Sequence, residues 1–463
     1  MRPVITPEES ARLDEAASDP VETLMDRAGA GIARAAAQMG VGYGSRVIAL
    51  AGPGNNGGDA YVAARLLRGR GAHVEVRALG YPRGDWSAAR KAACAAVAAG
   101  VRVRPLGPPD DADLVVDGLF GAGFHGSLPD DAAAWAEAGG RVLSVDLPSG
   151  LDGTDGSTEG PVFRAERTVT FHALKVGHVL GDGPTVTGEV EVVDIGLTGG
   201  DPALRLCEDA DAPAPPRERT AHKWSTGAVL VVGGSPGLEG AAVLAGRAAL
   251  EAGAGYVRVA CHPDAAGVVT RAEPSLTTMG WEPDDVLTAA ERFDVIALGT
   301  GLGPGDDAAA ITKAILDRWD GVLVLDADGL TAASARTIEA SAADVVLTPH
   351  AGEFERLFDE APGLDAIERA VASSGAVVLA KGGPTIVAGR ERWAVTSGGS
   401  ELATLGSGDV LTGMIAAFAA RGLPPEVAAR SAAHRHGRAG AAIAGSRTVT
   451  ASRLVDEIGR WSW

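Results

Sequence analysis

Apolar and polar residues follow two alternating patterns along the first two hundred positions. Helical spacing of apolar residues covers 7–39 and returns in 61–71 and 87–100. Short apolar runs that end in glycine or polar residues lie between these segments, at 46–52, 73–79, 113–123, 141–150 and 168–174. Nearly uninterrupted apolar runs are typical of strands buried on both faces. Strands that alternate with helices predict a parallel sheet flanked by helices.

The second half of the chain repeats this pattern. A helix is predicted over 240–255. Apolar runs that predict strands lie at 227–235, 256–261, 293–303, 321–330, 343–350 and 375–383. We therefore expect an α/β protein with mostly parallel sheets and three-layer α/β/α domains. In such sheets, ligands bind at the carboxyl ends of the strands.

The pattern breaks at Glu208–Arg219, EDADAPAPPRER, which is rich in proline and charge and has no apolar periodicity. Such a segment predicts an exposed, polyproline-II-like linker. It divides the chain into two domains, 1–212 and 213–463, each of a size usual for a single domain.

Charge and cysteine content exclude several classes of protein. The 463 residues include 41 Lys+Arg and 60 Asp+Glu, a net charge of −19, which argues against a general nucleic-acid binder. Three separated cysteines without a CxxC motif support neither a disulfide framework nor a cysteine zinc site. The spacing of His222, His434 and His436 does not favour zinc either. A polar, acidic N-terminus and the lack of 18 uncharged apolar residues in a row predict a cytoplasmic protein without a membrane span.

The first half carries polar residues at three predicted strand ends. Residues 52–60, GPGNNGGDA, follow a strand and open a helix, whose free N–H groups suit an anion such as a phosphate. Asp117 and Asp146 end two further strands and are expected at the same edge of the sheet. Asn and Ser oxygens with one carboxylate suit a hard monovalent cation, and Asp146 is placed to move a proton. Each Asp alone also fits a turn or a helix cap.

The second half contains a Gly-Ser-Gly turn directly before an apolar helix, in ATLGSGDVLTGMI at 403–415. The free N–H groups of such a turn form an anion hole for a transferring phosphoryl group. Asp409, in the first turn of that helix, is placed to accept a proton from a substrate hydroxyl, although it also fits an ordinary cap. Lys381 ends another strand and is expected to face a phosphate, whereas His350 also fits an ordinary loop residue.

Five motifs of domain 1–212 resemble the NAD(P)H-hydrate epimerase family, in the family's order: LMDRAG, GPGNNGGD, DGLFGAG, VDLPSG and TVTFHALKVGH. The resemblance implies a Rossmann-like fold, with Asp146 and Lys175 as catalytic residues. It also implies a potassium ion at Asn56, Asp117 and Ser149. The residues implied for dinucleotide binding are Asn55, Asn56, Gly57, Gly58, Asp59, Gly121, Ala122, Gly123, Phe124, His125, Gly126 and Ser127. Ala60 departs from the usual Gly, which is tolerated if that position is helical.

Residues Thr220–Trp463 resemble the ribokinase-like superfamily and, within it, the ADP-dependent NAD(P)H-hydrate dehydratases. The motifs are HKWSTGAVLVVGGS, GAAVLAGRAALEAGAGYV, TPHAGE, KGGPT and GSGDVLTGMI. The resemblance implies a hydrate site with Asp409 as the catalytic residue and with Ala241, Gly303 and His350. It implies an adenine nucleotide at Lys381, Gly382, Gly383, Pro384, Thr385 and Gly408. Trp224, Ala351 and the segment Gly398–Leu402 depart from the family pattern.

Together the two resemblances predict a bifunctional repair enzyme for hydrated NAD(P)H. The first domain is expected to interconvert the R and S hydrates. The second is expected to dehydrate the S form with ADP as co-substrate and magnesium beside the nucleotide, although ATP fits the same anion hole. A homo-oligomer is expected, with these small molecules as its partners. The alternative is an alcohol kinase fused to a non-catalytic nucleotide-binding module.

Overall fold

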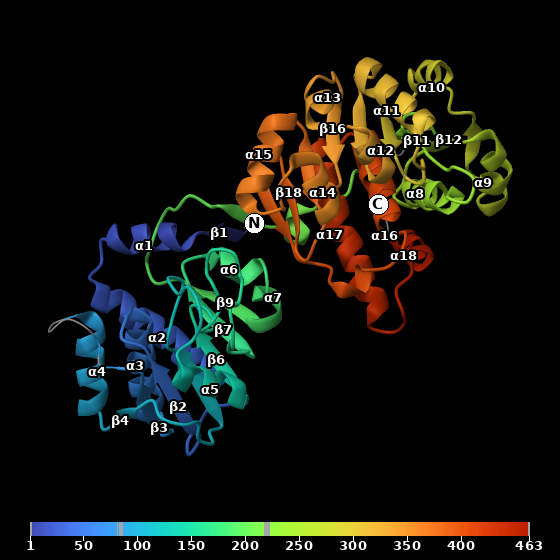
Figure 1. Cartoon of the computed structure of the whole chain (residues 1–463). Coiled ribbons are helices and arrows are strands. Elements are labelled where there is room, and N and C mark those ends of the chain that lie inside the picture. Colours follow the sequence, from blue (N-terminus) through green and yellow to red (C-terminus); the bar gives the residue numbers. More distant parts are fainter. Residues whose placement is uncertain (1, 81, 83–86, 217–222, 462–463) are drawn as a thin grey trace. The chain divides into compact units, whose positions relative to one another are not determined.

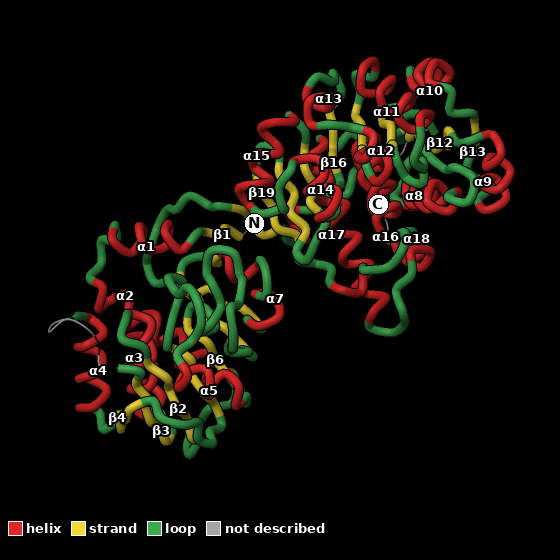
Figure 2. Tube along the Cα trace, viewed as in Figure 1, coloured by secondary structure: helices red, strands yellow, loops and turns green. Residues whose placement is uncertain are grey.

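The computed structural model describes residues 2–80, 82, 87–216 and 223–461 (Figure 1). The chain divides into two compact units, an N-terminal unit from Arg2 to Arg205 and a C-terminal unit from Leu206 onward. Each unit has helices on both faces of a sheet (Figure 2), as the alternation of helical and strand patterns predicts. In the part of the chain that is described, no helix is both long and apolar enough to cross a membrane.

The N-terminal unit is built on a seven-stranded sheet in which every neighbouring pair is parallel. In spatial order its strands are β4 (Arg102–Pro105), β3 (His73–Ala78), β2 (Arg46–Ala51), β5 (Leu114–Gly118), β6 (Val142–Val145), β7 (Arg167–Phe171) and β9 (Glu189–Val193). Outside this seven-stranded sheet, β1 (Arg2–Ile5) pairs in parallel with β8 (Leu174–Lys175). The order β2-β5-β6 places the three polar strand ends of the first half side by side, as predicted.

Helices cover both faces of this sheet. Val47 and Ala49 of β2 pack in one cluster with helices α2 to α4, while Ile48 and Leu50 pack in another with α5. This two-sided burial explains the uninterrupted apolar run of β2. The helices of the unit are α1 (Pro7–Glu15), α2 (Val21–Gln38), α3 (Asn55–Gly69), α4 (Ala88–Ala98), α5 (Asp130–Ala138), α6 (Val176–Val179) and α7 (Gly183–Val186).

The C-terminal unit contains a larger sheet that is parallel except at one end. In spatial order its strands are β13 (Thr277–Met279), β12 (Tyr256–Ala260), β11 (Ala228–Val232), β14 (Val295–Leu298), β15 (Val322–Leu325), β16 (Asp344–Leu347), β17 (Val377–Ala380), β18 (Thr385–Ala388) and β19 (Arg392–Val395). The last two, β18 and β19, run antiparallel to their neighbours.

Val229 and Val231 of β11 pack in one cluster with the long apolar helices of the C-terminal unit, and Leu230, between them, is buried as well. That cluster includes residues of α8 (Glu239–Glu251), α16 (Ser407–Ala420), α17 (Pro425–Ala444) and α18 (Ala451–Ile458). The remaining helices are α9 (Ala266–Ala272), α10 (Pro283–Ala290), α11 (Asp306–Arg318), α12 (Ala327–Ala332), α13 (Ala335–Glu339), α14 (Ala351–Phe358) and α15 (Leu364–Ser374).

The segment predicted as an exposed linker is instead bound to the C-terminal unit where it is described. Residues 209–211 form a short 3₁₀ helix, and Ala212 is buried. Asp209 pairs with Arg438, and the Ala212 carbonyl accepts hydrogen bonds from Arg435. The prediction of an exposed linker therefore holds only in part for 208–216. Asp209, Ala210, Pro213 and Pro216 are exposed, whereas Ala212 and Pro215 are buried, and oxygens of the segment bind basic residues on α17. Residues 217–219 lie outside the described part of the chain.

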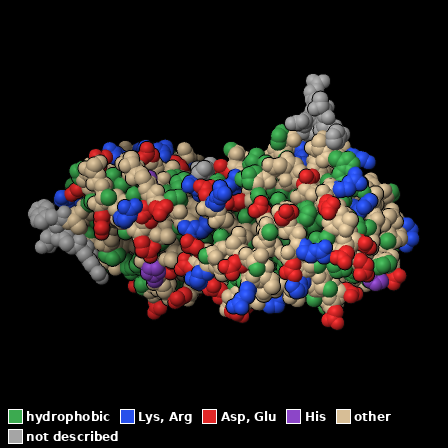
Figure 3. All heavy atoms as spheres, turned by 90° about the horizontal axis from the view of Figure 1, so that it is seen from above, with side chains coloured by type: hydrophobic (Ala, Val, Ile, Leu, Met, Phe, Trp, Pro, Cys, Tyr) green, Lys and Arg blue, Asp and Glu red, His purple; other side chains and the backbone are tan. Residues whose placement is uncertain are grey.

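Acidic and basic side chains are interspersed over the face that Figure 3 shows. All three cysteines, Cys94, Cys207 and Cys261, are free thiols, and the last two are buried.

Trp224, one departure from the family pattern, packs on Tyr256 with ring centroids 4.6 Å apart. Ala60 lies inside α3. The position is therefore helical, which is the condition under which alanine was expected to be tolerated in place of the usual glycine.

Candidate functional site

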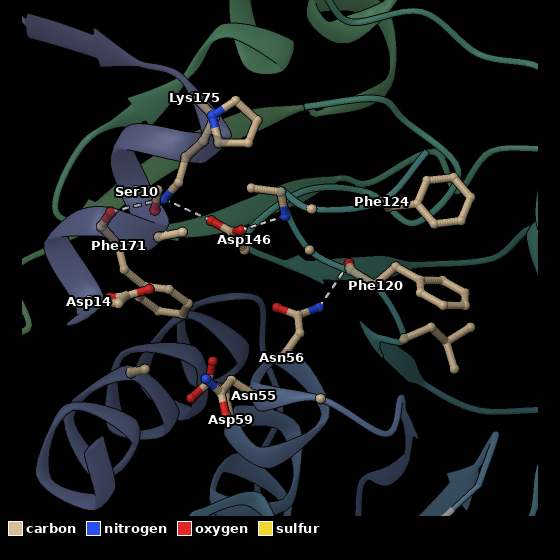
Figure 4. Close-up of a pocket in the computed structure, with 18 of the residues that line it drawn as sticks. Ser10, Asp14, Asn55, Asn56, Asp59, Phe120, Phe124, Asp146, Phe171 and Lys175 are labelled. Carbon is tan, nitrogen blue, oxygen red and sulfur yellow. Dashed lines mark hydrogen bonds and ion pairs between the residues drawn. The ribbon is translucent and has the colours of Figure 1, made fainter. Parts of the chain in front are cut away.

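A cavity of about 800 Å³ opens at the carboxyl ends of the N-terminal unit's strands. This volume is typical of a site for a small molecule or cofactor. The loop after β5, from Leu119 to His125, lines one side of it, and α1 and the start of α3 line others (Figure 4). Ser127 also lines the cavity, while Gly126 does not.

The Asn-Asn-Gly-Gly-Asp segment forms the first turn of α3. Asn55, Asn56 and Asp59 line the cavity, whereas Gly57 and Gly58 do not. A Cβ on Gly57 would lie 2.0 Å from the Gly52 carbonyl oxygen, and one on Gly58 would lie 2.5 Å from a Met25 side-chain carbon. The two glycines are therefore needed for the close packing of α3 on its neighbours, which places the three polar side chains at the cavity.

Asp146, directly after β6, is held by three groups. Its Oδ2 accepts a hydrogen bond from the Ala122 N–H at 2.9 Å, and its Oδ1 accepts one from the Thr170 hydroxyl at 2.9 Å. Lys175 Nζ lies 2.9 Å from the same Oδ1 (Figure 4). Burial alone would raise the pKa of Asp146, but the charge and hydrogen bond of Lys175 outweigh it and leave this pKa below its ordinary value. Asp146 is thus an ionised carboxylate at neutral pH.

His178 supports this pair from behind, and the sequence analysis missed it. Its Nδ1 accepts the Lys175 backbone N–H at 2.8 Å, so its Nε2 donates to the Asp146 carbonyl at 2.7 Å. Burial lowers the pKa of His178 to about 4, which keeps the ring neutral. The available signal was its position three residues after Lys175 in the same motif. Asp14 of α1 also lines the cavity, and the motifs did not single it out.

Three predicted metal ligands, Asn56, Asp117 and Ser149, are linked through hydrogen bonds of Ser149 and the Phe120 carbonyl. Ser149 Oγ donates to Asp117 Oδ1 at 2.6 Å and lies 3.3 Å from the Phe120 carbonyl oxygen. The Asn56 amide donates to that same carbonyl at 2.9 Å. Burial raises the pKa of Asp117 to about 6, against the hydrogen bonds from Ser149 and Ser144. The three side chains therefore form one cluster of oxygen donors, which Phe120 extends. In the described chain, no group of His, Cys, Asp and Glu side chains forms a metal site.

In the C-terminal unit, the predicted Gly-Ser-Gly turn caps α16. Gly406 has a φ of 88°, and a Cβ there would lie 2.6 Å from Leu244, so glycine is required. The backbone N–H groups of Gly408 and Asp409 donate to no other described residue and are free for an anion. Burial, with the nearby charge of Asp326, raises the pKa of Asp409 to about 7 against the opposing charge of Lys381.

Lys381 extends from the end of β17 toward this turn. Its Nζ lies 2.8 Å from Asp326 Oδ1 and 3.7 Å from Glu353 Oε2. Burial would lower the pKa of Lys381, but these two carboxylates raise it, so the amine stays charged. Thr412 of α16 donates to the second Asp326 oxygen at 2.7 Å. Asp326 thus ties Lys381 to the helix that carries Asp409, a link that the sequence did not reveal.

Three other predicted residues lie at neighbouring strand ends. His350 caps α14, with its Nδ1 accepting the N–H groups of Gly352 and Glu353. The Gly303 N–H, after β14, donates to Asp328 at 2.8 Å. Ala241 lies in the first turn of α8.

The segment from Gly382 to Thr385 connects β17 to β18 and contains a cis peptide bond before Pro384. His434 and His436 lie on α17, where His434 pairs with Asp209 at 2.8 Å and His436 is buried, with its pKa lowered by burial to about 4. His222 lies outside the described residues.

Comparisons with known proteins agree with this division of the chain. Residues 21–177 match the family model of the YjeF-related protein N-terminus, and residues 229–460 match that of NAD(P)H-hydrate dehydratase. A bifunctional NAD(P)H-hydrate repair enzyme of Moorella thermoacetica is 35% identical, over 98% of this chain and 95% of the relative. One of Mycobacterium leprae is 39% identical, over 96% and 95%.

Among solved structures, a ribokinase-like superfamily protein of Enterococcus faecalis is similar with a TM-score of 0.52 and 26% identity, over 56% of this chain and 95% of that one. A further similar structure is a protein of Streptococcus mutans, with a TM-score of 0.52 and 26% identity, over 55% and 97%. The C-terminal unit therefore has the ribokinase-like fold that was predicted. With relatives at more than 30% identity matching over nearly their whole length, this chain belongs to the family of bifunctional NAD(P)H-hydrate repair enzymes.

Proposed function

We propose that the two units divide the two reactions of the family. The N-terminal unit interconverts the epimers of hydrated NADH or NADPH, and the C-terminal unit dehydrates one epimer at the expense of a nucleotide. This assigns the epimerase to the domain predicted as 1–212 and the dehydratase to 213–463. The observation that carries the proposal is that each unit places a largely buried carboxylate, Asp146 or Asp409, and a charged lysine at the carboxyl ends of its strands.

In the N-terminal unit, Asp146 acts as the base. The substrate carries an added hydroxyl on the sixth carbon of the nicotinamide ring, and its two epimers interconvert when the ring opens and closes again. Asp146 is ionised because Lys175 pairs with it, so it is ready to take the hydroxyl proton. The dinucleotide is proposed to lie in the 800 Å³ cavity, against the loop from Gly121 to Ser127 and the first turn of α3.

The proposal includes a potassium ion at Asn56, Asp117 and Ser149. In support, the Ser149 hydroxyl lies within hydrogen-bond distance of both Asp117 and the Phe120 carbonyl, and the Asn56 amide donates to the same carbonyl. A carboxylate with neutral oxygens suits a hard monovalent cation. When bound, the ion would supply positive charge beside the loop that starts at Gly121. Thermal unfolding of the full chain should shift upward in potassium chloride relative to choline chloride, and Ser149→Ala should remove this difference.

In the C-terminal unit, Asp409 removes the proton from the hydroxyl of the S hydrate, and the oxygen attacks the β-phosphate of ADP. AMP leaves, and the phosphate ester then loses phosphate from the sixth ring carbon and a proton from the fifth, which restores the ring double bond of NAD(P)H. Phosphate is a far better leaving group than hydroxide, so a kinase-like site can perform a dehydration. The free N–H groups of Gly408 and Asp409, with Lys381, would stabilise the transferring phosphoryl group. A magnesium ion bound with the nucleotide would supply further charge neutralisation.

Two variants of the full chain separate the reactions. Asp146→Asn should stop exchange of the epimers in the absence of nucleotide and leave ADP-driven loss of the S hydrate intact. Asp409→Asn should do the reverse. Chromatography of the epimers and recovery of NADPH absorbance measure the two activities. If Asp409→Asn dehydrates at the rate of the unmodified chain, the proposed base is wrong. A stable phosphorylated alcohol in place of AMP, phosphate and NADPH would favour the alcohol-kinase alternative.

A homo-oligomer and a cytoplasmic location remain predictions.

A further inference from the structure

A second carboxylate of the N-terminal cavity, Asp59, is buried like Asp146 but lacks the partners that keep Asp146 ionised. Asp59 lies in the first turn of α3 and lines the cavity, with 8% of its surface exposed. Its carboxyl makes no hydrogen bond or ion pair with any described residue. A buried carboxylate without partners is costly, and such a group avoids the cost by staying protonated.

The groups that face Asp59 favour the neutral form as well. Burial raises the pKa of Asp59 well above its ordinary value, and the charges of Asp146 and Asp14 add to this rise, while Lys175 opposes it. Charged residues of the two helices packed beside α3 pair elsewhere, Lys91 of α4 with Glu22 of α2, and Asp26 of α2 with Arg65 of α3.

Asp146 and Asp59 reach the same cavity from different elements, the end of β6 and the start of α3 (Figure 4). One is ionised because it is paired, and the other is neutral because it is not. Two titratable groups whose surroundings push their pKa values apart are suited to serve as base and acid of one reaction.

We propose that Asp59 is the general acid of the epimerisation, with Asp146 as its base. The inference rests on the proposed assignment of this reaction to the N-terminal unit. Asp146 takes the proton of the ring hydroxyl, and the oxygen electron pair forms the carbonyl of an aldehyde. The bond between the sixth ring carbon and the ring nitrogen breaks, its electron pair passes to the nitrogen, and Asp59 donates its proton there. Closure onto the other face of the aldehyde returns both protons.

Asp14 tunes this acid without entering the chemistry. It lies on α1 at the same cavity, and its charge is one of those that raise the pKa of Asp59. Asp14→Asn should therefore move the alkaline limb of the exchange rate to lower pH, because Asp59 then ionises more easily. A residue that only shaped the cavity would alter KM without moving this limb.

The main test measures exchange from the pure S epimer by the full chain without nucleotide, so that dehydration does not interfere. Asp59→Asn keeps the size of the side chain but holds no transferable proton. It should lower kcat by about 10²-fold to 10⁴-fold, the range of a lost general acid, with a much smaller change in KM. Asp111→Asn, an exposed site on the same unit, is the matched control and should exchange at the unmodified rate.

The outcomes separate the inference from the proposed function. If the unmodified chain does not exchange epimers, the assignment of the reaction fails. If it exchanges and Asp59→Asn exchanges equally fast, the acid is wrong while the function stands. Carboxyl carbon NMR of the full chain labelled at aspartate gives a readout independent of activity. A resonance that Asp59→Asn removes should titrate well above the ordinary range of an aspartate, and titration near the ordinary value would overturn the inference.

Discussion

Each unit places its proposed catalytic carboxylate and a lysine at the carboxyl ends of its strands. The two units differ in which carboxylate the lysine binds. In the N-terminal unit, Lys175 binds Asp146 itself. In the C-terminal unit, Lys381 binds Asp326, and Asp409 has no direct ion pair with any residue that the structure describes. The pKa of Asp146 is therefore lowered, while burial raises that of Asp409 to about 7. The partner of the lysine, and not the fold, sets the charge of the base.

The largest effect should come from removing the base of the C-terminal unit. Asp409→Asn should lower ADP-driven dehydration by about 10²-fold to 10⁴-fold, because Asp409 is the base proposed to take the hydroxyl proton. Recovery of NADPH absorbance measures the rate. Asp320→Asn, at an exposed position of the same unit, should retain full activity. Equal loss in both variants would mean that the effect is not local.

The ion pair of the N-terminal unit should matter for stability as well as for chemistry. Lys175 is 2% exposed, and its Nζ contacts Asp146, Thr170 and the Phe171 carbonyl. Lys175→Met should cost about 3–5 kcal/mol of folding free energy in that unit, because Asp146 would lose its charge partner. Urea unfolding checks this. Lys381→Met, whose lysine is only partly buried, should cost less, and the opposite order would break the comparison.

The difference in pKa between Asp146 and Asp409 should become smaller when Asp326 is replaced. Asp326→Asn frees Lys381 from its nearest carboxylate and removes one charge that raises the pKa of Asp409. The acid limb of dehydration should then move to lower pH, with kcat reduced by about tenfold through the loss of lysine positioning. A pH profile that is unchanged would show that Asp326 does not control Asp409.

The smallest predicted effect is one that both units share. His178 and His436 are buried and neutral, each with its pKa lowered to about 4 by burial. In unfolded chains the pKa of histidine is about 6.5, so the unfolded state takes up more protons between these values. The contribution of each neutral histidine to the free energy of unfolding should therefore be complete above about pH 6.5 and should be lost as the pH is lowered toward 4. Thermal melts across this range measure it, and His178→Gln should flatten the fall in the N-terminal unit.

The sequence predicted the elements better than the contacts between them. Uninterrupted apolar runs predicted the parallel strands, and the strand ends predicted that Asp117 and Asp146 meet at one edge, because both follow from local pattern and sheet geometry. Asp326 as the partner of Lys381 did not follow, since 55 positions separate them and only the strand order β15-β16-β17 brings the two strand ends near each other.

The roles of some residues also depend on tertiary contacts. The resemblance assigned Gly57 and Gly58 to the dinucleotide, which stays a prediction, and their close packing against Gly52 and Met25 is a second reason for glycine at both positions. The proline-rich segment 208–216 has no apolar periodicity, but its carbonyl and acidic groups bind α17. Such contacts depend on tertiary partners that no local pattern encodes.

The most direct measurement is the pH dependence of kcat/KM for both reactions on one preparation of the full chain. Dehydration should lose rate as the pH falls through about 7, because Asp409 must be ionised to act as a base. Epimer exchange should persist to much lower pH, because Lys175 keeps the pKa of Asp146 below its ordinary value. Acid limbs at the same pH for both reactions would contradict the claim that the lysine's partner sets the base.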